Sequence, residues 1–188
     1  MRAAFLFAFI LAACSSGEEA AQHVARGKAL LGENKYEAAA AELSKATALD
    51  KNSMEAWLNL GHAYRGLKQH DTALAAYVAA KRLDRHSVAP HIAHAKVQLD
   101  LGRVDQATTE LNFVVEMDPK NLEALILLGQ VSQLPHKMED GTVGVSSASL
   151  ERAELNLDAA TRLDPKNAVA QAELASVRRK LSNLKEKK

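Results

Sequence analysis

The chain has 188 residues, a formal net charge of +1 and 4% aromatic residues. A charge this close to zero, without basic residues interleaved with aromatic ones, excludes the usual footprint of a nucleic-acid-binding protein. Its single cysteine excludes an internal disulfide and a cysteine-ligated metal site. We therefore expect no nucleic-acid partner and no cofactor.

The N-terminus has a basic residue, Arg2, then an apolar run at residues 3–13, then Cys14. The run is too short to cross a bilayer and is typical of a secretory signal peptide. A leucine and two alanines stand directly before the cysteine, and this arrangement resembles the signal of bacterial lipoproteins. The resemblance implies that residues 1–13 are removed and that the thiol of Cys14 carries a covalent lipid. The alternative is an ordinary signal peptide in which Cys14 has no special role.

Residues 14–19 are then expected to form a lipidated tether, and residues 20–188 a folded domain. A tether of this length reaches roughly 20 Å when extended, so the domain would stay near the membrane. Serine follows the cysteine, which resembles the outer-membrane sorting pattern of Gram-negative lipoproteins. The resemblance implies a protein of the bacterial cell envelope, anchored by lipid in the outer membrane and facing the periplasm.

Four similar turns recur along the folded domain, each with an aspartate after an apolar residue. The aspartates are Asp50, Asp84, Asp118 and Asp164, so the first two steps between turns are equal and the last step is longer. Between the turns, apolar residues recur with a period of 3.6 among residues that favour helix, and no strand pattern competes. A helical pattern with a repeated step of about 34 residues predicts an all-α solenoid of helix hairpins.

The second unit carries the series Trp57, Leu60, Gly61, Tyr64, Ala73, Tyr77 and Ala80. This series resembles the tetratricopeptide repeat (TPR). The resemblance implies a right-handed TPR superhelix, in which Gly61 and Ala73 leave room for large side chains such as Trp57 and Tyr77. We expect four units at 20–53, 54–87, 88–121 and 122–167, followed by a capping helix at 168–188.

Two segments depart from the repeat. The longer last step places an insertion near residues 135–149, and its glycines and polar residues predict a loop that is either functional or merely mobile. Ser149 is expected to cap the helix that follows. The C-terminus is basic from Arg178 to Lys188. It is either a solvated terminus favoured by the helix dipole or a contact with anionic lipid or peptidoglycan.

In TPR proteins the first helix of each hairpin lines the concave face, where partners bind. The family's concave positions in units two to four imply a groove with an apolar floor and polar flanks, suited to a peptide of mixed polarity. Its candidate residues are Leu58, Asn59, His62, Arg65, Ile92, Lys96, Leu99, Ile126, Gln130 and Gln133. The alternative is that the apolar members simply pack against neighbouring helices.

The sequence lacks the residues of three more specific kinds of site. TPR domains that bind chaperone C-termini use a clamp of lysine, asparagine and arginine, but Val24, Ala89 and Ala93 stand where that family needs basic or amide residues. His91 and His94 share a helix face without a third ligand, so we expect no metal site. Nucleophile and phosphate-binding motifs are absent, so we do not expect an enzyme.

The signal and the repeats together predict a membrane-anchored scaffold or adaptor that binds peptide segments of other envelope proteins. They resemble pilotin lipoproteins, which help a secretin ring reach the outer membrane for type IV pili. They also resemble adaptor lipoproteins that dock cell-wall hydrolases. A further alternative is a structural envelope lipoprotein that associates with itself through the ends of the solenoid.

Overall fold

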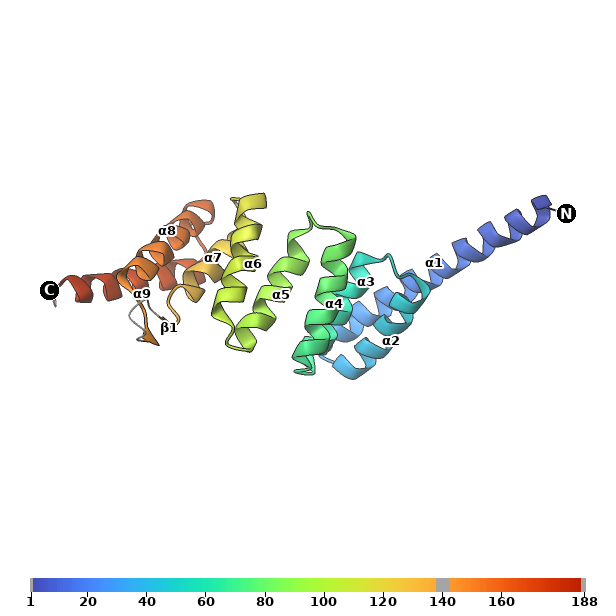
Figure 1. Cartoon of the computed structure of the whole chain (residues 1–188), viewed down its shortest axis with the longest axis horizontal. Coiled ribbons are helices and arrows are strands. Elements are labelled where there is room, and N and C mark those ends of the chain that lie inside the picture. The colour runs from blue at the N-terminus through green and yellow to red at the C-terminus, as the bar shows by residue number, and fades with distance from the viewer. Residues whose placement is uncertain (1, 138–142, 187–188) are drawn as a thin grey trace. The chain divides into compact units, whose positions relative to one another are not determined.

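The computed structural model describes residues 2–137 and 143–186, and within them the chain is helical apart from turns and one pair of short strands (Figure 1). The prediction of an all-α fold is confirmed. The helices are α1 (Arg2–Gly32), α2 (Tyr36–Leu49), α3 (Met54–Gly66), α4 (His70–Leu83), α5 (Val88–Asp100), α6 (Val104–Met117), α7 (Leu122–Val131), α8 (Ser147–Leu163) and α9 (Ala168–Lys185).

The chain divides into two compact units, Met1–Val97 and Gln98–Lys188, and the boundary falls within α5. In the first unit α1 packs against α2, α2 against α3, and α3 against α4. In the second unit α6 packs against α7, α7 against α8, and α8 against α9. In addition α1 contacts α3, and α7 contacts α9. Within each unit, the first helices of successive hairpins therefore lie side by side.

The recurring aspartates form the turns that lead into the next hairpin. One carboxylate oxygen of each aspartate accepts a hydrogen bond of 2.9 to 3.2 Å from the backbone N–H two residues later, at Asn52, His86, Lys120 and Lys166. The next helix then begins with a side-chain cap in which Ser53, Asn121 or Asn167 accepts from the N–H three residues on. Such aspartate turns and caps satisfy backbone donors that a helix start leaves unpaired.

The turns inside the hairpins repeat with the same step as the aspartates. Asn34, Lys68 and Gly102 stand at equivalent positions of successive repeats and have φ angles of 57°, 59° and 71°. In each turn the next residue donates its N–H to the carbonyl five residues earlier, at Leu30, Tyr64 and Gln98, over 2.8 to 2.9 Å. This pattern is the Schellman ending of a helix, which needs one residue in the left-handed conformation.

A glycine in the first helix faces a large buried side chain in the second helix of three hairpins. A Cβ atom at Gly27 would overlap Leu43, one at Gly61 would overlap Tyr77, and one at Gly129 would overlap Leu157. All three large side chains are completely buried. The tight approach of the two helices therefore depends on glycine at this position. Ala95 and Leu111 occupy the corresponding positions of the third repeat, and both are also buried.

The large aromatic residues of the second repeat are not equally buried. Tyr77 is fully buried, as the sequence predicted, whereas Trp57 and Tyr64 are only partly buried against a cluster that includes Leu43 and Leu60. The indole N–H of Trp57 donates to the carbonyl of Lys51 over 3.0 Å. Trp57 keeps its polar edge at the surface because the turn before α3 offers it an acceptor there.

The insertion is more ordered at its ends than the sequence predicted. Strand β1 (His136–Lys137) pairs antiparallel with β2 (Val143–Gly144), so the predicted loop contains a short strand pair that the sequence did not predict. The centre of the predicted loop, residues 138–142, lies outside the described residues. The cap of α8 is also corrected, since Ser146 accepts from the N–H of Ser149, and Ser149 is buried in the first turn. With this cap, α8 begins at Ser147, earlier than a cap at Ser149 would place it.

The N-terminal helix is longer than expected. α1 runs from Arg2 to Gly32, so residues 14–19, predicted as a tether, are helical here. Glu18 and Glu19 favour helix, alanines flank the segment at Ala13 and Ala20, and no proline interrupts it. In the part of the chain that the structure describes, no helix combines the length and apolar character needed to cross a bilayer. The side chain of Cys14 lies outside the described residues, and its lipidation stays a prediction.

The turn geometry gives a first stability prediction. Replacing Lys68 by glycine should stabilise the protein by about 0.5–1 kcal/mol, because a left-handed conformation costs a residue with a Cβ more than it costs glycine. The reciprocal change, Gly102→Ala, should destabilise by about 1 kcal/mol. The Gly102→Ala variant measures only the cost of the left-handed backbone conformation, since a Cβ at Gly102 would meet no atom within 4 Å. Urea unfolding of both variants measures the effect, and a Lys68→Gly variant no more stable than the original protein would contradict it.

Candidate functional site

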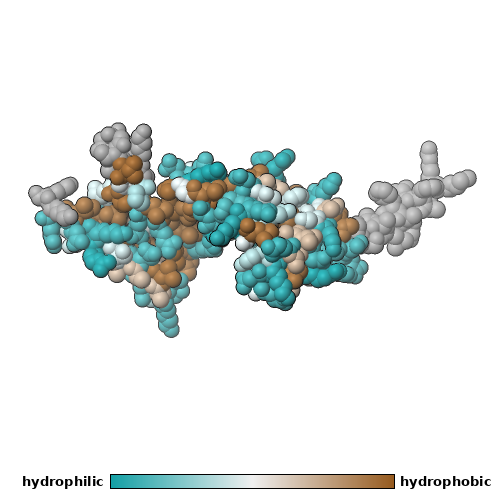
Figure 2. All heavy atoms as spheres, turned by 90° about the horizontal axis from the view of Figure 1, so that it is seen from below, coloured by the Kyte–Doolittle hydropathy of each residue, from teal (hydrophilic) through white to brown (hydrophobic). Residues whose placement is uncertain are grey.

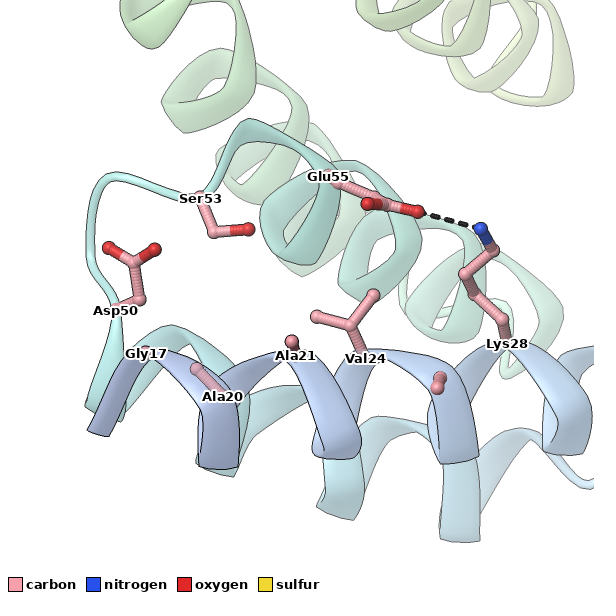
Figure 3. A pocket seen from close by; sticks show the side chains of 9 residues that line it. Gly17, Ala20, Ala21, Val24, Lys28, Asp50, Ser53 and Glu55 are labelled. Carbon is pink, nitrogen blue, oxygen red and sulfur yellow. Dashed lines mark hydrogen bonds and ion pairs between the residues drawn. The ribbon is translucent and has the colours of Figure 1, made fainter. Parts of the chain in front are cut away.

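A pocket of about 250 Å³ lies between α1 and α3 in the first unit (Figure 3). One wall is the face of α1 that looks toward α3, and the other is the turn after α2 with the first residues of α3. The lining residues are Gly17, Ala20, Ala21, Val24, Ala25, Lys28, Asp50, Ser53 and Glu55. The pocket is therefore built from the first helices of two successive hairpins, the elements that the sequence analysis assigned to partner binding.

The apolar floor of the pocket follows from the spacing of small residues in α1. Ala21, Val24, Ala25 and Lys28 have the spacing i, i+3, i+4 and i+7, which places them on one helix face. Val24 is buried, because it also contacts Ala46 of α2 and Ala56 of α3 in a small core cluster. A floor of short side chains leaves an open volume above it.

The rim of the pocket is charged. The Lys28 ammonium lies 2.6 Å from the Glu55 carboxylate, and both side chains are more than half exposed, so this ion pair contributes little to stability. Ser53 caps α3 through its hydroxyl oxygen, and Asp50 holds the preceding turn. Both residues thus have a structural role that also fixes their positions at the rim.

The size of the pocket limits what it can bind. Pockets for drug-sized ligands usually measure about 300–1,000 Å³, so this one suits a single side chain of a longer bound segment. Among the residues that the structure describes, no group of three or more histidine, cysteine, aspartate or glutamate residues could hold a metal ion. The visible face of the molecule is largely hydrophilic, with apolar patches within each unit (Figure 2).

The predicted groove residues of the second repeat lie together on α3. Leu58, Asn59, His62 and Arg65 are all partly buried. Asn59 uses its side-chain amide to donate to the carbonyl of Glu55 on its own helix. The Nδ1 atom of His62 lies 2.9 Å from the hydroxyl of Tyr77, and the two rings meet edge to face with centroids 5.5 Å apart. His62 is therefore held by the hairpin core and presents only part of its ring to a partner.

Three groove residues of the third repeat lie on α5. Lys96 and Leu99 are partly buried, but Ile92 has an exposed fraction of only 6%. Ile92 was predicted as part of an open apolar floor, and here it belongs to the buried core instead. An isoleucine at a helix face next to other helices gains more from packing than from exposure, which is the alternative that the sequence left open for the apolar residues.

The predicted residues of the fourth repeat are engaged by the final helix. Gln130 and Gln133 both donate to the carboxylate of Glu173 on α9, over 3.1 and 3.0 Å, and Gln133 accepts from Lys180 over 2.8 Å. Ile126 packs against a core cluster shared with α8 and α9. α9 therefore occupies part of the surface that the sequence analysis assigned to a partner.

The sequence analysis missed the residues of the first repeat that line the pocket. Its groove began at the second unit, yet Ala21, Val24, Ala25 and Lys28 stand one repeat before Glu55, Leu58, Asn59 and His62. The same register that gave the groove positions of the second unit would have identified them. Small apolar residues such as these alanines seldom mark a binding site by themselves.

A second hollow, of about 500 Å³, lies between α1 and α2 and is lined by Arg26, Ala29, Leu30, Ala38, Ala41 and Glu42. Its charged edge is a cluster around Glu42, which accepts from Lys45 and from the buried His23, each over 2.8 Å. The hydrogen bond from Lys45, and then that from His23, lower the pKa of Glu42 from 4.5 to about 2.

The lowered pKa predicts how acid affects stability. The Glu42 carboxylate stabilises the folded state fully above the ordinary pKa of 4.5, and this contribution is lost as the pH falls toward about 2. Unfolding by urea should therefore show that Glu42→Gln is less stable than the original protein at neutral pH. The difference in the free energy of unfolding should become smaller as the pH falls from 4.5 to about 2. A difference that does not change between pH 4.5 and pH 2 would contradict the assignment.

Comparison with known proteins identifies the repeats. The pattern described as "TPR repeat" matches residues 27–68, and that described as "Tetratricopeptide repeat" matches residues 55–87 and 92–132. A search of curated protein sequences finds no match. The matched segments contain α2, α3, α4, α6 and α7 and most of α5.

Solved structures with the same fold are similar over most of the chain. A Pseudomonas aeruginosa PilF structure has a TM-score of 0.75 and 18% identity, covering 90% of this chain and 72% of its own. YrrB, described as a TPR protein with an unusual peptide-binding site, has a TM-score of 0.65 and 22% identity. The match covers 94% of this chain and 84% of the YrrB chain. The first TPR of Spaghetti (RPAP3), bound to the HSP90 peptide SRMEEVD, has a TM-score of 0.60 and 23% identity. The match covers 62% of this chain and 93% of the RPAP3 chain.

Proposed function

We propose that this chain, which contains tetratricopeptide repeats, binds peptide segments of other proteins on the face formed by the first helices of its hairpins. The observation that carries the proposal is the pocket between α1 and α3, where small apolar residues form a floor beneath a charged rim. YrrB and the first TPR of RPAP3 are described as binding peptides, and this supports the same kind of partner for the present chain. No catalytic step is part of the proposal.

The proposal extends to where the protein acts. The segment before and around Cys14 resembles a bacterial lipoprotein signal, so we place the protein in the cell envelope, anchored by a lipid on that cysteine in the outer membrane. Its partners would then be other envelope proteins, and its role the assembly of a pilus or secretion complex. The fold that it shares with PilF is compatible with such a role.

A substitution that fills the pocket tests peptide binding. Ala25 lines the pocket and is exposed, so Ala25→Arg should fill the open volume without removing a core contact. We expect binding of the partner segment to weaken by roughly tenfold or more, measured by in-cell crosslinking and then by calorimetry with the purified segment.

The matched control is Ala48→Arg on α2, an exposed alanine outside the lining of both hollows. It adds the same charge to the same unit and should leave binding unchanged. Equal crosslinking by both variants, with both folded, would show that the face between α1 and α3 does not hold the partner.

Lipidation can be tested directly. Growth with labelled palmitate should label the protein, and Cys14→Ser should abolish the label and release the protein from the membrane fraction, because the chain has no second cysteine. Ser16→Ala is a suitable control, since it changes a neighbouring small residue and leaves the thiol in place. Label retained by the Cys14→Ser variant would disprove the lipid anchor.

A further inference from the structure

The pocket between α1 and α3 carries an uneven charge. Among its described lining residues, Asp50 and Glu55 supply two carboxylates and Lys28 supplies one ammonium group. The ammonium is already engaged by Glu55 over 2.6 Å. Figure 3 shows this pair at one end of the pocket and Asp50 at the other end, with Ser53 between them. The end near Asp50 is therefore negative, and it lies next to an apolar floor.

We propose that this pocket selects partner segments that insert a lysine or arginine side chain. The inference rests on the proposed function and adds the chemical class of the segment that is bound. The aliphatic stem of the inserted residue would lie on Val24 and the neighbouring alanines, and its cationic end would reach the Asp50 carboxylate. Lysine and arginine are suited to such a site because each combines an apolar stem with a charged end.

Asp50 is positioned for this contact before any partner binds. Its Oδ1 atom accepts the N–H of Asn52 over 2.9 Å, which fixes the carboxylate in the turn. A side chain that is already held in place loses little conformational entropy on binding, so more of the attraction appears as affinity. The Lys28 ammonium is held at the far end by Glu55 and does not neutralise Asp50.

The same charges disfavour an acidic segment. The first TPR of RPAP3 was solved with the peptide SRMEEVD, which ends in acidic residues and a terminal carboxylate. In the present chain the apolar Val24 lies in the floor of the pocket, and it offers no donor to a carboxylate. Carboxylates brought to the rim would meet Asp50 and Glu55, and such like-charge contacts reject the wrong partner. The pocket thus prefers the opposite charge.

The test is a display library of seven-residue peptides selected on the full-length protein. We expect the selected peptides to be enriched in lysine and arginine and depleted in acidic residues. For one selected peptide, Asp50→Asn should weaken Kd by about threefold to tenfold, since one partly exposed ion pair is lost. The same peptide with glutamine in place of its basic residue should bind both proteins equally. The effect of Asp50→Asn should also shrink at high salt.

Asp84→Asn is the matched control. Asp84 holds the next turn in the same way, with its Oδ1 accepting the N–H of His86 over 2.9 Å, but it does not line the pocket. Asparagine keeps the acceptor oxygen at both positions, so both turns should survive, and a thermal melt checks this. Glu55→Gln is a second variant that removes a rim carboxylate from an exposed position, and it should also weaken the basic peptide.

The outcomes separate the two proposals. Peptides that bind without a preference for basic residues, or whose preference survives both Asp50→Asn and Glu55→Gln, would overturn this inference and leave peptide binding intact. A library from which no peptide is selected would overturn the proposed function and this inference together. Equal loss of binding in Asp84→Asn would assign the effect to the turns and would also overturn it.

Discussion

The contact between a glycine and a large buried side chain determines how each hairpin is assembled. At Gly61 there is no Cβ, so the ring of Tyr77 can approach the backbone of α3, and Gly27 and Gly129 admit leucines in the same way. Because protein interiors are closely packed, the pair fixes both the separation of the two helices and their rotation about their axes. That rotation decides which face of the first helix is left for a partner, and so the pocket depends on the contact that a neighbouring face of α1 makes with α2.

The turns transmit this arrangement from one hairpin to the next. A left-handed residue ends the first helix, and an aspartate turn followed by a cap starts the next hairpin, so the length of each connection is set by hydrogen bonds rather than by packing. Asp50 shows how one residue can serve two purposes. The hydrogen bond that forms its turn also holds its second oxygen at the rim of the pocket, and a structural requirement thereby supplies a fixed charge for binding.

The periodic features could be predicted from the sequence, and the local ones could not. The constant step between turns indicated the helical fold, and the series around Trp57 indicated the repeat, because both patterns recur along the chain. The strand pair at His136 and the cap at Ser146 occur once, inside the insertion, where several serines and glycines offer equivalent choices. The burial of Ile92 depends on what packs against α5, and a position in a repeat does not determine that. A periodic pattern in the sequence does not predict contacts that occur only once.

The pocket itself arises where the residues depart from the repeat. At the position of Leu58 in α3 the first repeat has Val24, and at the position of Asn59 it has Ala25, so shorter side chains leave an open volume on this face of α1. The glycine contacts and the left-handed turn residues recur at equivalent positions of both repeats. A repeat fold therefore specifies where a partner can lie, while the residues that vary between units specify which partner it is. For this chain the informative residues are the alanines of α1 and the charges beside them.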